Sequence, residues 1–317
     1  MGKVIVVVGS LNMDVAVPVQ RLPVAGETVL GSDATFAEGG KGGNQAAAAA
    51  ALGAAVRMVG RVGRDAFGER LVMGLRELGV DVSMVETVSG TTGIAVIVVD
   101  ERGQNQIAVA PGANLAIDVN AISSARSAIE TAGVVVLQCE IPSAAIEETV
   151  RIAAIKGVPV LLNAAPADQC PRSVLPDVAY LVVNEVEAEQ LTGMRVTGLE
   201  SARIVVRLLR QMGPNRVVVT LGKAGAVADD GTGPIHVPAP LVQVVDATGA
   251  GDAFVGALAR SIVADAPFFE AVHFGVLAGS LAVTRVGARA SLPSLGDVRR
   301  LCRREVDCAQ FQWLQPS

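Results

Sequence analysis

The chain has 317 residues, a formal net charge of −5, 51% hydrophobic residues and only 3% aromatic residues. Its core must therefore be built from Val, Ala, Leu and Ile, and short Val-rich runs are typical of strands buried on both faces of a parallel sheet. The acidic balance disfavours nucleic-acid binding, which usually relies on a clustered basic face, but it does not exclude a phosphate-bearing ligand held by local loops.

The cysteines, histidines and apolar runs indicate the cellular compartment of the protein and whether it could hold a structural metal ion. Four cysteines without CxxC spacing and two distant histidines disfavour a structural zinc site, so we expect free thiols in a reducing compartment. The apolar run at 4–8 ends at Gly9 and is too short for a signal-peptide core. The small apolar stretch at 46–56 falls short of a membrane span. The sequence thus predicts a soluble, cytoplasmic protein that binds no membrane.

The first elements along the chain are a strand, an irregular segment and a helix. Residues 4–8 form a β-branched run closed by Gly-Ser, which predicts a buried strand. Residues 11–38 alternate polar and apolar side chains and are punctuated by prolines and glycines, which indicates edge strands and turns. The glycine cluster at 39–44 leads directly into an alanine-rich helix that we expect to end at Gly53.

A short strand at 56–59 and a helix capped by Asp65 precede a hairpin. Residues 92–100 and 104–109 alternate in hydrophobicity, with a turn between them. Because this hairpin stands outside the surrounding strand–helix rhythm, as residues 11–38 do, we expect the two segments to form one small sheet. The predicted division is a main domain of residues 1–10, 39–90 and 110–317, and a small sheet of residues 11–38 and 91–109.

From residue 120 onward strands and helices alternate regularly. This rhythm predicts a Rossmann-like α/β sandwich with a mostly parallel central sheet and helices on both faces. A further apolar strand is expected at 241–245, and the tail after Leu301 is expected to be loosely attached. The other predicted helices are 121–130, 143–156, 185–191 and 199–212, and the other strands are 134–138, 158–163, 180–183 and 216–220.

The segment from Asp246 to Asp252 is the strongest candidate for chemistry. Small residues before an Asp at a helix start allow backbone N–H groups to face an anion. Asp252, presented beside such an anion, can accept a proton from an attacking hydroxyl. A glycine-rich turn that Asp252 merely caps is the alternative, and the motif alone does not decide between them.

The glycine cluster at 39–44 is the second candidate. Its small residues allow close backbone approach to a ligand, and Lys41 and Asn44 can reach hydroxyl groups. It is neither a Walker loop, since GxxxxGK[ST] is absent, nor a dinucleotide fingerprint, which would follow the first strand. A flexible turn is the alternative, and a run of six such residues disfavours it.

Three weaker candidates also lie near strand ends. Asn184 and Glu187 can share a helix face and hold the water shell of Mg²⁺, although a helix N-cap with a capping-box acid is favoured on this segment alone. Residues 220–226 form a strand end and a glycine turn, which suits a nucleotide contact or an ordinary hairpin. Asn12 and Asp14 share a strand face and suit vicinal hydroxyls, or they form an Asx turn.

These elements, in this order, resemble the ribokinase/PfkB family of carbohydrate kinases over residues 4 to about 293. The glycine cluster at 39–44 and the segment 246–252, which is close to the pattern DTxGAGD, look like the two family signatures. Residues 9–14, 111–114, 137–142 and 184–189 are similar to the ribokinase branch of that family.

The resemblance implies transfer of the γ-phosphoryl group of ATP to a sugar hydroxyl, the 5-hydroxyl of D-ribose in that branch. Asp252 would be the base, and Gly249, Ala250 and Gly251 would form the anion hole. Mg²⁺ near Glu187 and an activating K⁺ are implied as cofactors. The small sheet would be a lid over the sugar and would pair two subunits in a homodimer. The implied sugar site is Asn12, Asp14, Gly40, Lys41, Asn44, Glu140 and Asp252; the ATP site is Asn184, Thr220, Gly222, Gly225 and Gly251; and the potassium site is Asp246, Thr248, Ala282, Arg285, Gly287 and Ser291.

Alternatives stay open at this point. Val276 falls where many family members carry an Asn near the adenine, so the nucleotide preference is not fixed. A family kinase for 2-deoxyribose, a nucleoside or pseudouridine is the nearest alternative, because sugar choice depends on a few hydrogen bonds. An intact Asp252 disfavours a non-catalytic sugar sensor, and the absence of GxGxxG after the first strand sets aside a nicotinamide-dependent oxidoreductase.

Overall fold

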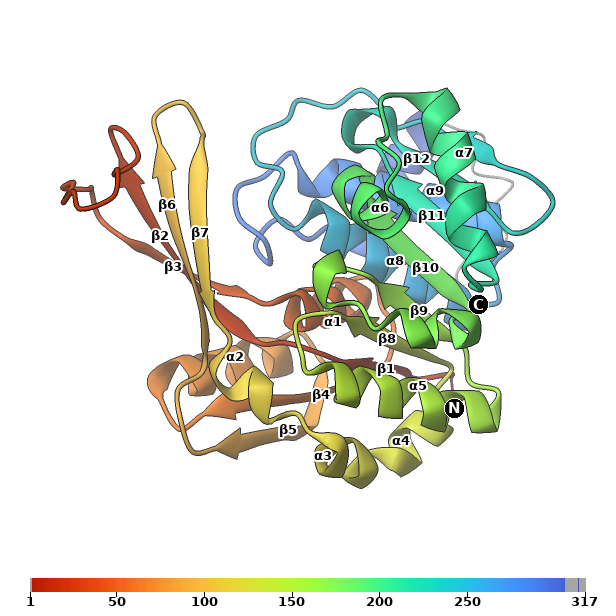
Figure 1. The fold of residues 1–317 in the computed structure, drawn as a ribbon, viewed down its shortest axis with the longest axis horizontal. Coiled ribbons are helices and arrows are strands. Elements are labelled where there is room, and N and C mark those ends of the chain that lie inside the picture. Colours follow the sequence, from red (N-terminus) through yellow and green to blue (C-terminus); the bar gives the residue numbers. More distant parts are fainter. Residues whose placement is uncertain (1, 306–312, 314–317) are drawn as a thin grey trace.

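The computed structural model describes residues 2–305 and residue 313, and the chain folds around a nine-stranded sheet (Figure 1). The strand order is β13-β12-β11-β10-β9-β8-β1-β4-β5. β12 is antiparallel to its two neighbours, and the other neighbouring pairs are parallel, which confirms the predicted fold class. The strands are β1 (Ile5–Val8), β4 (Val56–Gly63), β5 (Asp81–Val88), β8 (Val134–Gln138), β9 (Val160–Asn163), β10 (Tyr180–Asn184), β11 (Arg216–Thr220), β12 (Ala226–Asp229) and β13 (Ile235–Val237).

Helices cover both faces of this sheet. Alternate residues of β1 enter two separate hydrophobic clusters, Val6 and Val8 in one and Ile5 and Val7 in the other. The first cluster is closed by α3 (Val119–Ser124), α4 (Arg126–Glu130), α5 (Ser143–Lys156), α6 (Glu185–Thr192) and α7 (Leu199–Gln211). The second is closed by α1 (Lys41–Ala51), α2 (Ala66–Glu77), α8 (Ala250–Val263) and α9 (Phe268–Ala282). Among the described residues, no helix combines the length and the apolar sequence needed to cross a bilayer.

The predicted loose end after Leu301 lies partly outside the described residues, and within them the prediction is wrong. α10 (Leu295–Glu305) continues past Leu301, and Cys302 is fully buried against α9. Nε1 of Trp313 donates a hydrogen bond of 2.7 Å to Glu270 on α9. The Trp313 ring also meets Phe274 edge-on, with 5.3 Å between centroids. These contacts attach the described part of the tail to α9.

Two other predictions for the main domain need correction. Residues 241–245 do not form a strand: Leu241, Val244 and Val245 are exposed in an irregular segment, so their apolar character does not come from core packing. Conversely, β5 was not predicted. Only Val82 of this strand is buried, because it forms the edge of the sheet, and its hydrophobic pattern is therefore weak.

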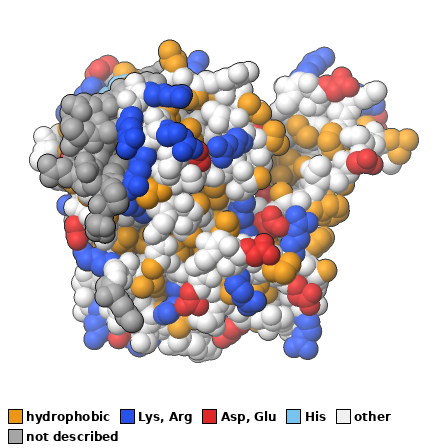
Figure 2. Space-filling view, turned by 180° about the vertical axis from the view of Figure 1, so that it is seen from behind, with side chains coloured by type: hydrophobic (Ala, Val, Ile, Leu, Met, Phe, Trp, Pro, Cys, Tyr) orange, Lys and Arg blue, Asp and Glu red, His pale blue; other side chains and the backbone are white. Residues whose placement is uncertain are grey.

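Residues 11–38 and the hairpin at 91–109 form one small sheet, as predicted. Its order is β3-β2-β6-β7, with β2 (Asn12–Val19), β3 (Thr35–Gly39), β6 (Gly93–Asp100) and β7 (Asn105–Ala110). β2 and β6 are parallel, whereas the outer pairs are antiparallel. The sheet projects from the body of the molecule in Figures 1 and 2. The proposed boundaries of the two domains stay a prediction.

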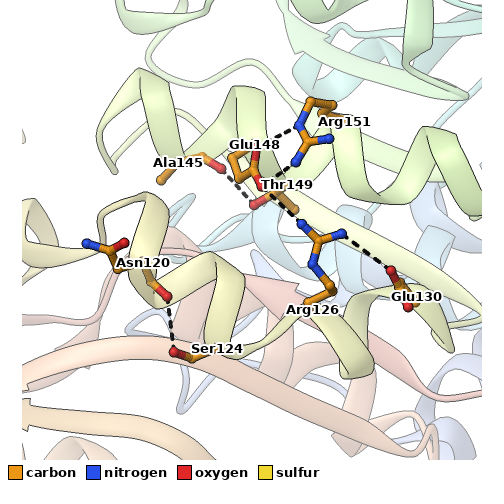
Figure 3. A network of polar contacts seen from close by, with 8 residues as sticks. All are labelled: Asn120, Ser124, Arg126, Glu130, Ala145, Glu148, Thr149 and Arg151. Carbon is orange, nitrogen blue, oxygen red and sulfur yellow. Dashed lines mark hydrogen bonds and ion pairs between the residues drawn. The ribbon is translucent and has the colours of Figure 1, made fainter.

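Ion pairs on the outer surface join α4 to α5, and Figure 3 also shows hydrogen bonds within α3 and within α5. Arg126 lies between Glu130 and Glu148, at 3.5 and 3.6 Å, and Arg151 contacts Glu148 at 2.7 Å. Exposed ion pairs of this kind contribute only about 0–1 kcal/mol each. We therefore assign them a minor part in stability and none in the site described next.

Candidate active site

The candidate site lies where the chain changes direction across the sheet. β1 and β8 are neighbours, and the chain proceeds from β1 toward β4 and from β8 toward β9, on opposite sides. In doubly wound sheets ligands bind beyond the carboxyl ends of strands at such a point. Here Oγ of Ser10 donates to a carboxylate oxygen of Glu140 at 2.5 Å, which joins the ends of the two strands. The backbone N–H of Lys41 donates to the same oxygen at 3.1 Å, so the start of α1 meets them.

Asp252 is buried in the first turn of α8, at the centre of the predicted residues. One of its carboxylate oxygens accepts a hydrogen bond from Nδ2 of Asn44, and the other accepts one from Nε2 of Gln45, both at 3.0 Å. Both amides come from α1, so α1 and α8 fix the carboxylate between them. Gly249, the N-cap of α8, has φ 77°, and a Cβ on it would lie 2.9 Å from Cα of Ala288. Glycine there permits both the left-handed turn and the close approach of the next loop.

Burial dominates the electrostatics of Asp252. It raises the pKa of the carboxyl above its ordinary value, although the charge of Lys41 and the two amide hydrogen bonds oppose the rise. Burial alone would lower the pKa of Lys41, but the carboxylates of Asp252, Glu140 and Glu187 outweigh it, and the net pKa is raised. Lys41 therefore stays cationic beside a carboxyl group with increased basicity, an arrangement suited to proton transfer near an anion.

The sugar-site candidates lie around the start of α1. Gly40 is the N-cap of α1 with φ 80°, and a Cβ on it would lie 2.7 Å from the backbone nitrogen of Asn12. Only glycine allows this approach, which brings α1 against β2. Asn12 is itself buried, and its side-chain oxygen accepts a hydrogen bond of 2.7 Å from Nδ2 of Asn114. Oδ1 of Asn44 is buried and accepts no hydrogen bond from the described residues. An unused acceptor of this kind suits a ligand hydroxyl.

Asp14 lies on β2 near the same point. Burial, followed by the charge of Glu140, raises the pKa of its carboxyl to about 6, and the charge of Arg289 opposes this rise. Asp14 carboxylate oxygens lie against Gly39, where a Cβ would be only 2.3 Å away. Sequence reasoning missed Arg289, because nothing near it in the chain indicates that it reaches β2.

Two of the three anion-hole candidates, Gly249 and Gly251, line a pocket of about 210 Å³, and Ala250 does not line it. Gly249, Gly251 and Asp252 line it from α8, and Lys41 lines it from α1. Its other predicted members are Asn184 and Thr220, the last residues of β10 and β11, and Glu187 in the first turn of α6. Sequence reasoning missed its remaining lining residues, Asn163, Ala165, Val182, Val183 and Val255.

Asn184 and Glu187 form the capping box that the sequence favoured. The Asn184 side chain accepts from the backbone N–H of Glu187 at 2.9 Å, and a Glu187 oxygen accepts from the backbone N–H of Asn184 at 2.8 Å. Both residues nevertheless line the pocket, and burial raises the pKa of Glu187 while Lys41 opposes it. The Glu187 and Asp252 carboxylates in one pocket are hard oxygen donors, so the residues present fit a hydrated Mg²⁺. No larger cluster of acidic, His or Cys side chains suited to a metal occurs in the described residues.

The remaining ATP-site candidates lie beyond the end of β11. Gly222 begins a single 3₁₀ turn (Gly222–Ala224) and has open space where a Cβ would be. At Gly225 a Cβ would lie 2.0 Å from the carbonyl oxygen of Val237, so this glycine is needed for the packing of the hairpin. Val276 is buried in the hydrophobic cluster beneath α9 and does not line the pocket.

The potassium-site candidates bring two loops together. Asp246 accepts hydrogen bonds from the backbone and hydroxyl of Thr248, at 2.9 and 2.6 Å, and from the backbone of Gly287, at 2.8 Å. The carbonyl of Ala282 accepts a 3.3 Å hydrogen bond from Arg285, and the hydroxyl of Ser291 donates to Ala288 at 2.9 Å. Carboxylate, hydroxyl and backbone carbonyl oxygens are hard donors that suit an alkali cation, and these candidate residues carry all three kinds.

A chain of buried amides supports Asp252 from behind, and sequence reasoning did not find it. Nε2 of Gln138 donates to Gln45 at 2.7 Å, and Nε2 of Gln45 is also 3.0 Å from Oδ1 of Asn163. Asn163 donates in turn to the carbonyl of Val182 at 3.2 Å. The available signal was polar residues at the ends of the otherwise apolar strands β8 and β9.

Comparisons with known proteins agree with this geometry. The family model described as pfkB family carbohydrate kinase matches residues 3–295. A ribokinase of Schizosaccharomyces pombe is 37% identical over 93% of this chain and 96% of its own, and a deoxyribokinase of Salmonella typhi is 34% identical over 92% and 96%. The solved structure of Arabidopsis thaliana ribokinase complexed with ribose and ATP has a TM-score of 0.86 and 35% identity, covering 95% of this chain and 99% of its own. With a family match over nearly its whole length and the family's two glycine-rich segments meeting at Asp252, the chain belongs to the pfkB family of carbohydrate kinases.

Proposed function

We propose that the protein is a ribokinase, which transfers the γ-phosphoryl group of ATP to the 5-hydroxyl of D-ribose. The observation that carries this proposal is the position of Asp252. Its buried carboxylate lies between the amides of α1, where the sugar candidates gather, and the pocket beneath the start of α8. Ribokinases among the relatives, and a structural neighbour bound to ribose and ATP, support ribose as the acceptor.

Asp252 is proposed to take the proton of the acceptor hydroxyl. The freed oxygen forms a bond to the γ-phosphorus, the bond from that phosphorus to the bridging oxygen breaks, and ADP leaves with the electron pair. The raised pKa of Asp252 makes its carboxylate a better proton acceptor than an exposed one. The unused oxygen of Asn44, together with Asp14 and Glu140, supplies acceptors for the other sugar hydroxyls.

The start of α8 is proposed to bind the transferred phosphoryl group. Backbone N–H groups at a helix N-terminus face outward and carry partial positive charge. The amide of Ala250 makes only a long hydrogen bond of 3.3 Å to Ala247, and Gly251 lines the pocket with open space beside it. Preorganised donors of this kind typically contribute about 3–4 kcal/mol of transition-state stabilisation each. Lys41, which lines the same pocket, adds a positive charge.

Two cations are proposed. Glu187 would hold hydrated Mg²⁺ in this pocket, and the ion would supply positive charge to offset that of the ATP phosphates. K⁺ would be held by the side chain of Asp246 and by carbonyl and hydroxyl oxygens of Thr248, Ala282, Arg285, Gly287 and Ser291. Because Asp246 already ties the 283–291 loop to the segment before α8, its role would be to fix the shape of the anion hole.

The small sheet is proposed as a lid and as the contact of a homodimer. Asp14 lies opposite Ala95, which lies opposite Val109, and Ala16, Ile97 and Ile107 form the next row. Residues paired in this way share one face. An apolar face therefore extends outward from Asp14, and Ile107 and Val109 on it are half exposed. Exclusion of water by such a cover limits futile ATP hydrolysis. Cys139 and Cys170 are free buried thiols, as expected, but Cys302 is disulfide-bonded, so the expectation of free thiols is wrong for Cys302. The two free thiols support the cytoplasmic location that we propose, and the disulfide does not.

The test is a coupled assay of ADP release with ATP and Mg²⁺, using ribose, 2-deoxyribose, fructose, adenosine and pseudouridine, each with and without K⁺. We expect ribose-dependent turnover that K⁺ increases. The deoxyribokinase relative makes 2-deoxyribose the second candidate, and a higher kcat/KM for that sugar would assign the protein to it. Binding of ribose and ATP without turnover would contradict the kinase and favour a sensor.

A further inference from the structure

Arg289 lies in the loop after α9 but reaches the start of α1 and the root of the small sheet. Its Nη2 donates to the carbonyl oxygen of Gly39, the last residue of β3, at 3.3 Å, across 250 positions of sequence. A Cβ on Gly43 would lie 2.3 Å from the same nitrogen. The guanidinium thus occupies space that only a glycine at position 43 leaves free.

The positive charge of Arg289 is only partly satisfied by the described residues. Its Nε and Nη1 are buried and donate to none of them. The acidic groups that act on it are Glu38, Asp14 and Asp252. Glu38 already pairs with Arg70 at 2.6 Å, and Asp252 receives its hydrogen bonds from α1. Among the described residues, Asp14 is the one of these three acidic groups that makes no ion pair and receives no side-chain hydrogen bond, and Arg289 is the cation that acts on it.

Building on the function proposed above, we propose that Arg289 is a positioning residue of the sugar site, which keeps Asp14 negatively charged and holds the Gly39 carbonyl at the root of the lid. Gly39 precedes Gly40, so the same contact helps to fix the turn into α1. The loop of Arg289 is also tied to Asp246 through the backbone of Gly287. Arg289 therefore gives the proposed cation loop a direct contact with the sugar side of the site.

The charged groups that face Asp14 determine in which direction its pKa moves when Arg289 is replaced. Glu140 and Asp252 favour its neutral form, in addition to burial, and Arg289 favours its charged form. Replacing Arg289 by a neutral residue leaves only carboxylates acting on Asp14, so the pKa of Asp14 rises further above 6. Near neutral pH a larger fraction of Asp14 is then protonated, and the neutral carboxyl is a weaker acceptor for sugar hydroxyls because one of its oxygens has become a donor.

The experiment compares Arg289→Gln with the native enzyme by calorimetric titration of ribose and by kinetics from pH 5 to 9. We expect the ribose Kd to rise about tenfold and the acid limb of kcat/KM to move to higher pH by about one unit, while kcat at saturating ribose changes by less than about threefold. Arg300→Gln is the matched control, because it removes an exposed charge on α10, outside the site, that pairs with Asp297. It should leave both quantities unchanged.

Arg289→Lys is the second variant and carries the test if Arg289→Gln does not fold. It keeps the charge but loses the planar fork, so the acid limb should stay in place while the Kd rises about two- to threefold. A native ribose Kd and acid limb in Arg289→Gln, or an acid limb displaced by a full unit in Arg289→Lys, would overturn the proposal. The native enzyme is titrated first: if it neither binds nor phosphorylates ribose, the proposed function fails. If it is active, the two outcomes just named decide the inference about Arg289 on its own.

Discussion

At the scale of single residues, Asp252 combines burial, two amide partners and a neighbouring lysine, and its substitution separates catalysis from folding. We expect Asp252→Asn to lower kcat by about 10²–10⁴-fold, because the proton acceptor is lost while the side chain keeps its size. Burial disfavours the charged form of Asp252, so removing the charge should not lower the melting temperature substantially. A coupled assay and thermal unfolding measure the two effects. Near-native kcat in a folded variant would exclude Asp252 as the base.

Asp14 gives a second residue-scale prediction, in the pH dependence. Its pKa is raised to about 6, first by burial and then by Glu140, so the carboxyl is protonated below that pH and charged above it. Since the charged form is the one proposed to accept the sugar hydroxyls, kcat/KM for the sugar should fall as the pH drops through about 6. Asp14→Asn should weaken sugar binding and flatten this limb. Asp252 and Glu187 also have raised pKa values, so a limb that persists unchanged in Asp14→Asn belongs to one of them.

At the scale of elements, the loop of residues 283–291 supports the start of α8. Asp246 holds the backbone of Gly287, and Gly249 leaves room for Ala288. We expect Asp246→Asn to lower kcat roughly tenfold or more, comparable to the loss of one charged hydrogen bond, and to abolish activation by K⁺. Kinetics with K⁺ and with Na⁺ measure both.

The matched control for Asp246 is Asp230→Asn. The carboxylate of Asp230 accepts hydrogen bonds from the backbone N–H and the hydroxyl of Thr232, at 3.1 and 2.6 Å. Asp246 accepts the same pair from Thr248, but Asp230 lies in an exposed turn after β12. It should change neither kcat nor the K⁺ response. If Asp246→Asn keeps the full response to K⁺, the cation is not held at this loop.

Elements also show where sequence reasoning works and where it does not. The glycine runs at 39–44 and 246–252 were correctly predicted to start helices, because the turn into each helix depends on the conformations that nearby glycines allow. β5 was missed and 241–245 was wrongly predicted as a strand, since both depend on which side chains the rest of the chain covers. The contact of Arg289 with Gly39 and the Gln138–Gln45–Asn163 chain join distant segments, so no local pattern indicates them.

At the scale of the whole molecule, the small sheet leaves an apolar face that the body does not fully cover. Ile107 is 56% exposed and Val109 53% exposed on the outer strand β7, on the face that carries Asp14. An exposed edge strand with such a face is a site for pairing with another chain. The sheet also lies apart from the main body in both views of the molecule (Figures 1 and 2). A second copy of this chain is the partner that we propose.

Charge placed on this face should therefore dissociate the dimer. We expect light scattering to give a dimer for the native protein at micromolar concentration and a monomer for Ile107→Glu, because a buried carboxylate without a partner costs several kcal/mol. Ile155→Glu is the matched control: Ile155 is 63% exposed on α5, far along the chain from the lid, and its substitution should leave the dimer intact. The lid of the monomer would lose its support, so the KM for the sugar should rise more than kcat falls. A native protein that is monomeric would contradict the dimer. A dimeric Ile107→Glu variant would show that the interface lies elsewhere. The KM for the sugar would then test the proposed role of the lid separately.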